Sequence, residues 1–211
     1  MDKTKIAVEI FNKCANQYQH KFMNVDLYSD TLDLFSKNII NENADILELA
    51  CGPGNLTKYL LNKRLDFKIL GIDMAPNMLE LAKINNPIAE FQLMDCRDIG
   101  KLNKVFDGII GGFCLPYLSK DESVLLIHNA SRLLKTNGIL YLSTMEDDYR
   151  KSGFQKGSTG DEIYIHYHQA DYLIQALEES DFKIINLQRK NYITDDGTRT
   201  IDLVIIASKE N

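Results

Sequence analysis

Residues 45–55, DILELACGPGN, decide the fold of this chain. The first six residues form a short apolar run typical of a β-strand, and a helical pattern begins at Asn55. Between the two, Gly52 and Gly54 let the backbone turn tightly and approach a ligand closely, because neither residue has a Cβ atom. A strand, a glycine turn and a helix in direct succession predict the first unit of an α/β sheet with a ligand loop at its carboxyl edge.

The same alternation of strand and helix continues along the chain. Pro76 occupies the first position of one helix, and the capping box Ser119–Glu122 opens another that Asn137-Gly138 ends. The predicted strands span residues 45–50, 67–73, 89–94, 105–111, 139–144, 182–193 and 200–207. Parallel strands joined by helices require right-handed crossovers and a sheet covered on both faces. The pattern therefore predicts an α/β, doubly wound, seven-stranded, mostly parallel sheet.

The two ends of the chain extend this core. Apolar residues at steps of three and four predict two helices within the first forty residues, so we expect residues 1–40 to form an N-terminal helical cap or lid. Residues 145–162 are polar and predict a loop, followed by an extended piece at 163–168 and a helix at 169–180. Asp195-Asp196-Gly197 predicts the turn of a C-terminal antiparallel hairpin.

These segments define the expected organisation of the chain. A length of 211 residues fits a single domain. Within it we expect a cofactor-binding core at residues 44–144 and a substrate-side loop, helix and hairpin at residues 145–211.

Composition excludes several classes of function. Lys and Arg number 24 against 30 Asp and Glu, a net charge of −6 that argues against nucleic-acid and membrane partners. No apolar run approaches the ~18 residues of a membrane span. The four cysteines include no CxxC pair, which favours reduced thiols and a cytoplasmic protein. The histidines have no Cys or Asp at ligand spacing, so we expect no metal site.

Acidic residues stand at three successive strand ends. Glu48 lies four residues before Gly52, where it suits an ammonium better than a phosphate. Asp73 suits the two hydroxyls of a ribose, although it could equally cap the next helix. Asp95 and the N–H of Cys96 suit an exocyclic amino group and a ring nitrogen of adenine, or Asp95 could be an ordinary turn residue.

The segments ILELACGPGNLTKYL, ILGIDMAPNMLELAK, MDCRD, VFDGIIGGFCLPYL and LLKTNGILYLS resemble, in order and spacing, the class I S-adenosylmethionine-dependent methyltransferases. The resemblance covers about residues 44–144 and implies S-adenosyl-L-methionine as cofactor, with Glu48 near the methionine ammonium, Asp73 at the ribose, and Asp95 and Cys96 at the adenine. The cofactor-binding residues implied in this way are Tyr18, Glu48, Ala50, Gly52, Gly54, Asn55, Asp73, Met74, Asp95, Cys96 and Phe113.

The chain departs from the family pattern at two places. Ala50 replaces a glycine that usually precedes the Cys-Gly pair. Gly111-Gly112 stands where many relatives carry a polar residue, which removes a common indication of the substrate.

Candidates for catalysis lie after the fourth strand and near residue 166. Tyr117 ends a segment beside the expected methyl group, and His166 and His168 share one face of an extended piece. A histidine can remove a proton near neutral pH, but each of these two could instead have a structural role. Tyr18, Phe22 and Tyr28 could be core residues or lid contacts.

The resulting hypothesis is methyl transfer by in-line displacement to an oxygen or nitrogen atom of a small-molecule acceptor, by a monomer or homodimer. One alternative is an RNA- or protein-directed methyltransferase. Another is a nicotinamide-dependent oxidoreductase, which Thr57 at the third glycine position and Glu48 before the loop disfavour. The last is a non-catalytic module that binds adenosylmethionine.

Overall fold

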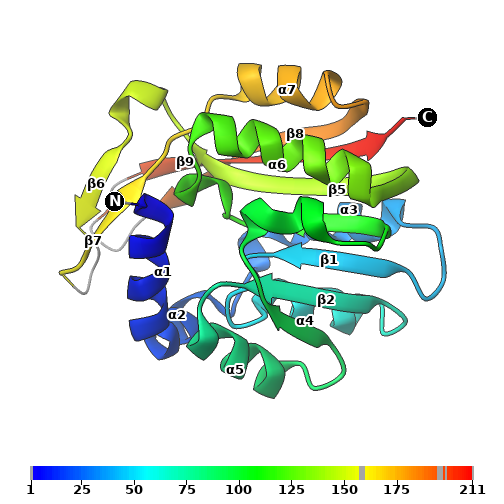
Figure 1. Cartoon of the computed structure of the whole chain (residues 1–211), viewed down its shortest axis with the longest axis horizontal. Helices are drawn as coiled ribbons and strands as arrows, with labels where there is room; N and C mark the ends of the chain where they lie inside the picture. Colours follow the sequence, from blue (N-terminus) through cyan, green and yellow to red (C-terminus); the bar gives the residue numbers. More distant parts are fainter. Residues whose placement is uncertain (1, 157–159, 194–196, 198, 211) are drawn as a thin grey trace.

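The computed structural model describes residues 2–156, 160–193, 197 and 199–210. Its main sheet has seven strands in the order β3-β2-β1-β4-β5-β9-β8 (Figure 1). The strands are β1 (Asp45–Leu49), β2 (Lys68–Asp73), β3 (Glu90–Leu93), β4 (Phe106–Gly111), β5 (Leu134–Glu146), β8 (Phe182–Ile193) and β9 (Arg199–Lys209). The five neighbouring strands β3, β2, β1, β4 and β5 run parallel to one another, and β9 is antiparallel to both β5 and β8. The predicted α/β fold, with its antiparallel C-terminal pair, is confirmed.

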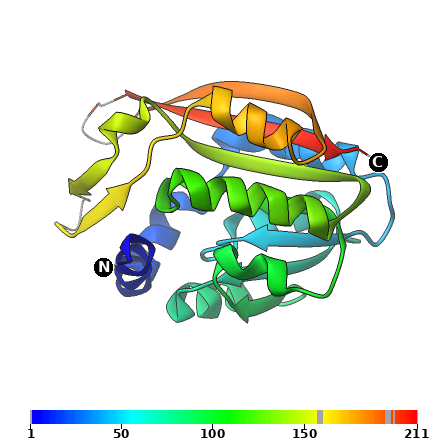
Figure 2. The same cartoon turned by 45° about the horizontal axis from the view of Figure 1, so that its top comes forward.

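Helices cover both faces of this sheet. Apolar residues of α3 (Ser29–Asn38) and α4 (Asn55–Lys63) pack on one face, and those of α6 (Lys120–Leu133) and α7 (Ala170–Glu178) on the other (Figures 1 and 2). The central strand β1 is therefore apolar on both sides, with Ile46 in one cluster and Leu47 in the other.

The chain order of the strands reverses between β1 and β4, so the connections leaving these two strands diverge. Open α/β sheets bind ligands at such a point, beyond the carboxyl ends of the strands. Helix α5 (Pro76–Asn85) follows β2, and α1 (Lys3–Lys13) and α2 (Ala15–Phe22) lie beside it. The N-terminal segment therefore lies against the carboxyl edge of the sheet.

The prediction of two helices in the first forty residues is wrong. The backbone leaves the helical conformation at Cys14, which separates α1 from α2, and a short 3₁₀ turn (Asp26–Tyr28) precedes α3. Ala7 and Ala15, on either side of the break, are both buried, so the apolar pattern continues across Cys14. For this reason the periodicity could not reveal the break.

The helix before β5 is shorter than predicted. It ends at Leu133 rather than at Asn137-Gly138, and β5 begins at Leu134. Asn137 has a φ of 61° and lies where the pairing of β4 with β5 shifts register, between the pairs Phe106–Leu134 and Gly108–Ile139. The Asn-Gly pair thus forms an irregularity inside a strand instead of a helix terminus.

The predicted loop at residues 145–162 contains regular structure. It includes the end of β5, a 3₁₀ turn (Tyr149–Lys151) and β6 (Gly153–Lys156), which pairs antiparallel with β7 (Glu162–Ile165) in a second sheet. Polar composition concealed this strand, because backbone hydrogen bonds rather than apolar burial define it. The hairpin turn predicted at Asp195-Asp196-Gly197 lies largely outside the described residues, but its flanking strands pair from Ile193 and Arg199 onward.

Within the part of the chain that the structure describes, no helix has the length and apolar character needed to cross a membrane.

Candidate functional site

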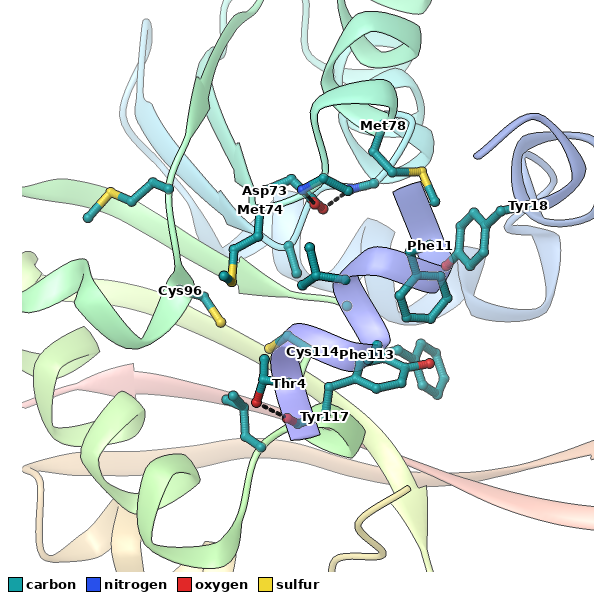
Figure 3. A pocket seen from close by; sticks show the side chains of 18 residues that line it. Thr4, Phe11, Tyr18, Asp73, Met74, Met78, Cys96, Phe113, Cys114 and Tyr117 are labelled. Atoms are coloured by element: carbon teal, nitrogen blue, oxygen red, sulfur yellow. Dashed lines mark hydrogen bonds between the residues drawn. The ribbon is translucent and has the colours of Figure 1, made fainter. Parts of the chain in front are cut away.

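A cavity of about 90 Å³ lies at the carboxyl edge of the sheet, under α1 (Figure 3). Helix α1 supplies Thr4, Ala7, Val8 and Phe11 to its wall. Seven residues of the predicted cofactor set also line it: Tyr18, Ala50, Gly52, Asp73, Met74, Cys96 and Phe113. The other four, Glu48, Gly54, Asn55 and Asp95, do not line it. The strand ends and the N-terminal helix therefore enclose one common space.

The glycine turn after β1 serves two purposes. Gly52 has a φ of 53° and faces the cavity, where a Cβ atom would stand 3.8 Å from the ring of Tyr18. Gly54 has a φ of 77° and faces α5, where a Cβ would lie 2.3 Å from the amide nitrogen of Asn86. The next residue, Asn55, donates its side-chain N–H to the carbonyl of Phe22. Gly52 thus keeps the cavity open, whereas Gly54 and Asn55 hold α4, α5 and α2 together.

Asp73 lies at the tip of β2 with both carboxylate oxygens hydrogen-bonded. Oδ2 accepts the N–H of Gly52 and Oδ1 that of Ala75, each at 2.8 Å (Figure 3). Burial raises the pKa of this carboxyl, and the backbone N–H groups partly oppose the rise. Each carboxylate oxygen has two lone pairs, so one on each remains for a hydroxyl in the cavity. The alternative that Asp73 caps α5 is wrong, because the N-cap is Ala75 and the helix has no side-chain cap; Asp73 instead fixes the turn before the helix and has the capacity to hold a ribose.

Glu48 is buried behind the wall of the cavity, with 1% of its surface exposed. Its carboxylate accepts a hydrogen bond from the hydroxyl of Thr57. Burial raises the pKa of Glu48 to about 8. Thr57 therefore has a structural reason to occupy the third position of the glycine motif, as the partner of this carboxylate.

Asp95 is bound by its neighbour Arg97 rather than facing the cavity. The guanidinium makes hydrogen bonds of 2.7–3.1 Å to both carboxylate oxygens of Asp95. It also pairs with Asp2, the N-cap of α1, at 3.1 Å, and with Glu122 of α6 at 3.0 Å. Cys96 does line the cavity. Arg97 thus joins the expected adenine loop, α6 and the start of α1.

The loop after β4 forms the opposite wall. Phe113 has a φ of 57°, an unusual conformation for an aromatic residue, and its N–H donates to the hydroxyl of Ser143 at 3.0 Å. Tyr117 lines the cavity, and its carbonyl accepts the hydroxyl of Thr4 at 2.8 Å. Burial raises the pKa of the Tyr117 phenol, so it stays neutral at physiological pH. Of the three predicted catalytic residues, Tyr117 is the one that reaches this space.

Tyr18 packs among aromatic residues at the same place. Its ring centroid lies 5.6 Å from that of Phe11 and 4.7 Å from that of Phe22. Burial, with the nearby charges of Asp73 and Glu48, raises its pKa to about 12. Tyr18 is thus both a packed residue and a wall residue.

The structure does not bring His166 and His168 to the cavity. His168 is fully buried, and its Nε2 lies 2.8 Å from the carbonyl of Leu115. A carbonyl only accepts, so Nε2 carries the proton and Nδ1 accepts from the hydroxyl of Tyr172. Burial lowers the pKa of His168 to about 4. His166 is also buried and lies against the rings of Tyr149 and Tyr164.

Several wall residues escaped the sequence analysis. Thr4 and Met78 line the cavity, and Arg97 links its surroundings. Met78 lies close to the motifs and could have been found from the spacing. Thr4 contacts Tyr117, 113 residues away, and no local pattern signals such a contact.

The cavity offers donors and acceptors that fit adenosylmethionine. The Asp73 carboxylate suits vicinal hydroxyls, and the open face of Gly52 permits close approach of a ligand. Apolar, sulfur-bearing side chains (Met74, Met94 and Cys96) suit a flat heterocycle.

Comparisons with known proteins agree with this geometry. Residues 46–138 match a family model described as a methyltransferase domain. The malonyl-[acyl-carrier protein] O-methyltransferase of Acetivibrio thermocellus is 33% identical over 66% of this chain and 49% of its own length. The trans-aconitate 2-methyltransferase of Enterobacter sp. is 36% identical over 51% of this chain and 42% of its own length. The chain therefore spans about half or less of these two curated relatives.

A solved structure shows the same fold. An S-adenosylmethionine-dependent methyltransferase from Methanosarcina mazei superposes with a TM-score of 0.69 at 22% identity, over 82% of this chain and 96% of its own. The comparisons support the predicted family, the class I S-adenosylmethionine-dependent methyltransferases, and S-adenosyl-L-methionine as the cofactor; the match to the methyltransferase domain covers residues 46–138 of this chain.

Proposed function

We propose that this chain transfers a methyl group from S-adenosyl-L-methionine to an oxygen or nitrogen atom of a small-molecule acceptor by in-line displacement. The observation that carries the proposal is the cavity that Gly52, Asp73 and Cys96 line together with the aromatic side chains of α1 and of the loop after β4. Two relatives, the malonyl-[acyl-carrier protein] and trans-aconitate methyltransferases, support methyl transfer as the reaction class.

Adenosylmethionine supplies a methyl group that its sulfonium already activates. The chain then has to hold the acceptor in line and exclude water, and good orientation alone can contribute ~7–11 kcal/mol. Phe11, Phe113 and Tyr117 provide apolar walls for this purpose, and α1 covers the space from solvent. Tyr117 is suited to position an acceptor through its neutral phenol.

The proposal extends to partners and location. The net charge of −6 supports a small-molecule acceptor rather than nucleic acid. We also propose that the protein is cytoplasmic, which reduced thiols would favour, and that it acts as a monomer or homodimer. His166 and His168 remain candidates for a base only if the segment directly after β7 rearranges, because both are buried outside the cavity.

Label transfer tests the proposal. The purified chain is incubated with methyl-labelled adenosylmethionine in three separate reactions, which contain a small-molecule extract, total RNA or total protein from cells. We expect label in the small-molecule fraction. Label confined to RNA or protein would establish a macromolecular acceptor instead. Absence of label from all three fractions, with adenosylhomocysteine bound, would indicate a non-catalytic module; thermal stabilisation by a dinucleotide alone would indicate an oxidoreductase.

A further inference from the structure

A buried carboxylate near the cavity is not part of the site described so far. Asp202 lies near the start of β9 with 3% of its surface exposed. The hydroxyl of Tyr28 donates to its Oδ2 at 2.6 Å. Within the described part of the chain, Asp202 accepts no other hydrogen bond. A buried acidic group is thus held by one neutral phenol.

The charged groups around Asp202 do not neutralise it. Lys190 is its partner across β8 and β9, on the same face of the sheet, but the Lys190 amine binds Asp30 at 2.6 Å. On the β5 side, the hydroxyl of Tyr141 lies 3.2 Å from that of Thr31. Burial raises the pKa of Asp202, and the hydrogen bond from Tyr28 opposes the rise. Burying a carboxylate without a cation costs free energy, so its presence calls for a reason.

The pair stands beside the cavity wall. The ring of Tyr28 meets that of Phe113 edge-on, with centroids 5.4 Å apart, and Phe113 lines the cavity. Asp202 is paired with Met145, two residues beyond the Ser143 that binds the Phe113 N–H. The pair therefore belongs to the carboxyl edge of the sheet, on the side of β4 and β5 away from Asp73.

Anchoring alone does not explain a buried charge. The chain ties α3 to α4 with another tyrosine–aspartate pair, Tyr59 and Asp33, at 2.7 Å on the exposed surface. There the carboxylate keeps its hydration and also binds Lys63. Asp202 is buried from solvent and, among the residues that the structure describes, forms no ion pair, which favours a role in the reaction over a structural one.

We propose that Tyr28 accepts the proton of a methyl acceptor that carries an O–H or N–H group, while Asp202 takes the proton of Tyr28. This inference rests on the proposed function. Tyr28 packs against the wall residue Phe113 without itself lining the cavity, so in this scheme the acceptor binds beside Phe113 and passes its proton to Tyr28, while Asp202 orients the phenol and stores the proton.

The proton and electron changes balance. The acceptor atom uses a lone pair to form its bond to the methyl carbon, the carbon–sulfur bond breaks, and its electron pair stays on sulfur. The acceptor proton moves to the oxygen of Tyr28, and the phenol proton moves to Asp202. A positive sulfonium and a negative carboxylate both become neutral, which a buried, water-poor site favours.

The scheme defines the substrate class. An alcohol, phenol or neutral amine has the proton that Tyr28 would accept, whereas an ionised carboxylate has none. We therefore infer an O–H or N–H acceptor, unlike the malonyl and aconitate groups in the names of two relatives.

Three variants test the roles of the residues. Tyr28→Phe keeps the ring contact with Phe113, and Asp202→Asn keeps the size of the side chain. Tyr59→Phe is the matched control, because it removes a tyrosine–aspartate hydrogen bond between residues that do not line the cavity. With the acceptor extract, we expect the first two to lower the rate of label transfer about 100-fold and the control to leave it unchanged. Adenosylhomocysteine affinity and melting temperature are measured for all three to establish that the site is intact.

The pH profile separates proton storage from anchoring. The rate of the wild-type enzyme should rise with pH as Asp202 ionises and then level off. The Asp202→Asn variant should not show this rise. Difference infrared spectra of wild type against Asp202→Asn, taken without turnover, give the pKa of the same carboxyl. The infrared midpoint should coincide with the kinetic one. The assignment would be overturned if the rate of Asp202→Asn rose with pH as in the wild type, or if Tyr28→Phe and Asp202→Asn both transferred label at the wild-type rate.

The product identifies the acceptor class. Mild alkali releases labelled methanol from methyl esters but not from ethers or N-methyl compounds, so we expect alkali-stable label. Alkali-labile label would overturn the inference while leaving the proposed methyl transfer in place. Absence of any label would instead contradict the proposed function itself.

Discussion

Two regions of this molecule are rich in reactive side chains, and they differ in what those side chains face. The first is the cavity at the carboxyl edge, with Asp73, Cys96 and Tyr117. The second is the segment directly after β7, where His166 and His168 lie among tyrosines. In the first region polar atoms keep unused capacity toward open space, whereas His168 spends both ring nitrogens on Leu115 and Tyr172. A density of reactive residue types is therefore weaker evidence for a site than unused hydrogen-bonding capacity beside a cavity.

The largest effect is expected in the glycine turn. Gly52→Val should weaken adenosylhomocysteine binding more than about 100-fold, because the branched side chain would enter the cavity at a φ of 53°. Calorimetric titration measures the affinity. Gly160→Val is the matched control, because Gly160 has a φ of 84° and no atom of the residues that the structure describes lies within 4 Å of its Cβ position. Equal affinity in wild type and Gly52→Val would mean that the ligand does not approach this turn.

Proton linkage at Glu48 should produce the next largest effect. Its pKa of about 8 makes the free carboxyl largely neutral at pH 7, and a bound ammonium nearby would favour the ionised form. Affinity for adenosylhomocysteine should then rise roughly tenfold per unit between pH 6 and 7, with proton release. Glu48→Gln should abolish both the pH dependence of the affinity and the proton release. Calorimetric titration in buffers with different heats of ionisation measures the affinity and the number of protons released. A pH-independent wild-type affinity would argue against an ammonium near Glu48.

The same carboxyl makes a prediction for stability. The folded state holds the Glu48 proton more tightly than the unfolded chain does, since burial raises the pKa from 4.5. The free energy of unfolding should therefore fall as pH rises from about 4.5 to about 8. Denaturant unfolding of Glu48→Gln across this range should lack that contribution.

A histidine variant tests the second region directly. His168→Gln should lower the free energy of unfolding by about 1–3 kcal/mol, because buried partners lose their hydrogen bonds. Cofactor affinity should stay unchanged. The exposed His128→Gln serves as control and should change stability by less than about 0.5 kcal/mol. Normal stability with a loss of turnover at neutral pH would restore His168 as a candidate base.

The smallest effect concerns the ion pair between α1 and Arg97. Asp2→Asn keeps an N-cap side chain but removes the charge that faces Arg97. We expect adenosylhomocysteine to dissociate a few-fold faster, in line with ~0.2–1 kcal/mol for a partly exposed pair. Asp2→Ala should add a loss of helix stability. Surface plasmon resonance measures the rate, and an unchanged rate in Asp2→Asn would show that the pair does not hold α1 in place.

The sequence was informative where structure follows from neighbours along the chain. The strands, Gly52 and Asp73 were predicted because the turn and the strand end are local features. The relation of Arg97 to Asp2, 95 residues apart, and the burial of His168 against Leu115 depend on tertiary packing. Strand β6 was missed because none of its four residues is buried and its pairing is made by backbone groups.

Helix α1 has a consequence for the rate of turnover. A cavity of about 90 Å³ is well below the ~300–1,000 Å³ of typical ligand sites, and α1 forms part of its wall. We therefore expect α1 to move away from the sheet when a nucleoside enters or leaves. Such gating steps commonly set the steady-state speed of an enzyme. We therefore expect a fast first turnover, a slower steady state, and a slowing of that steady state by viscous cosolvents.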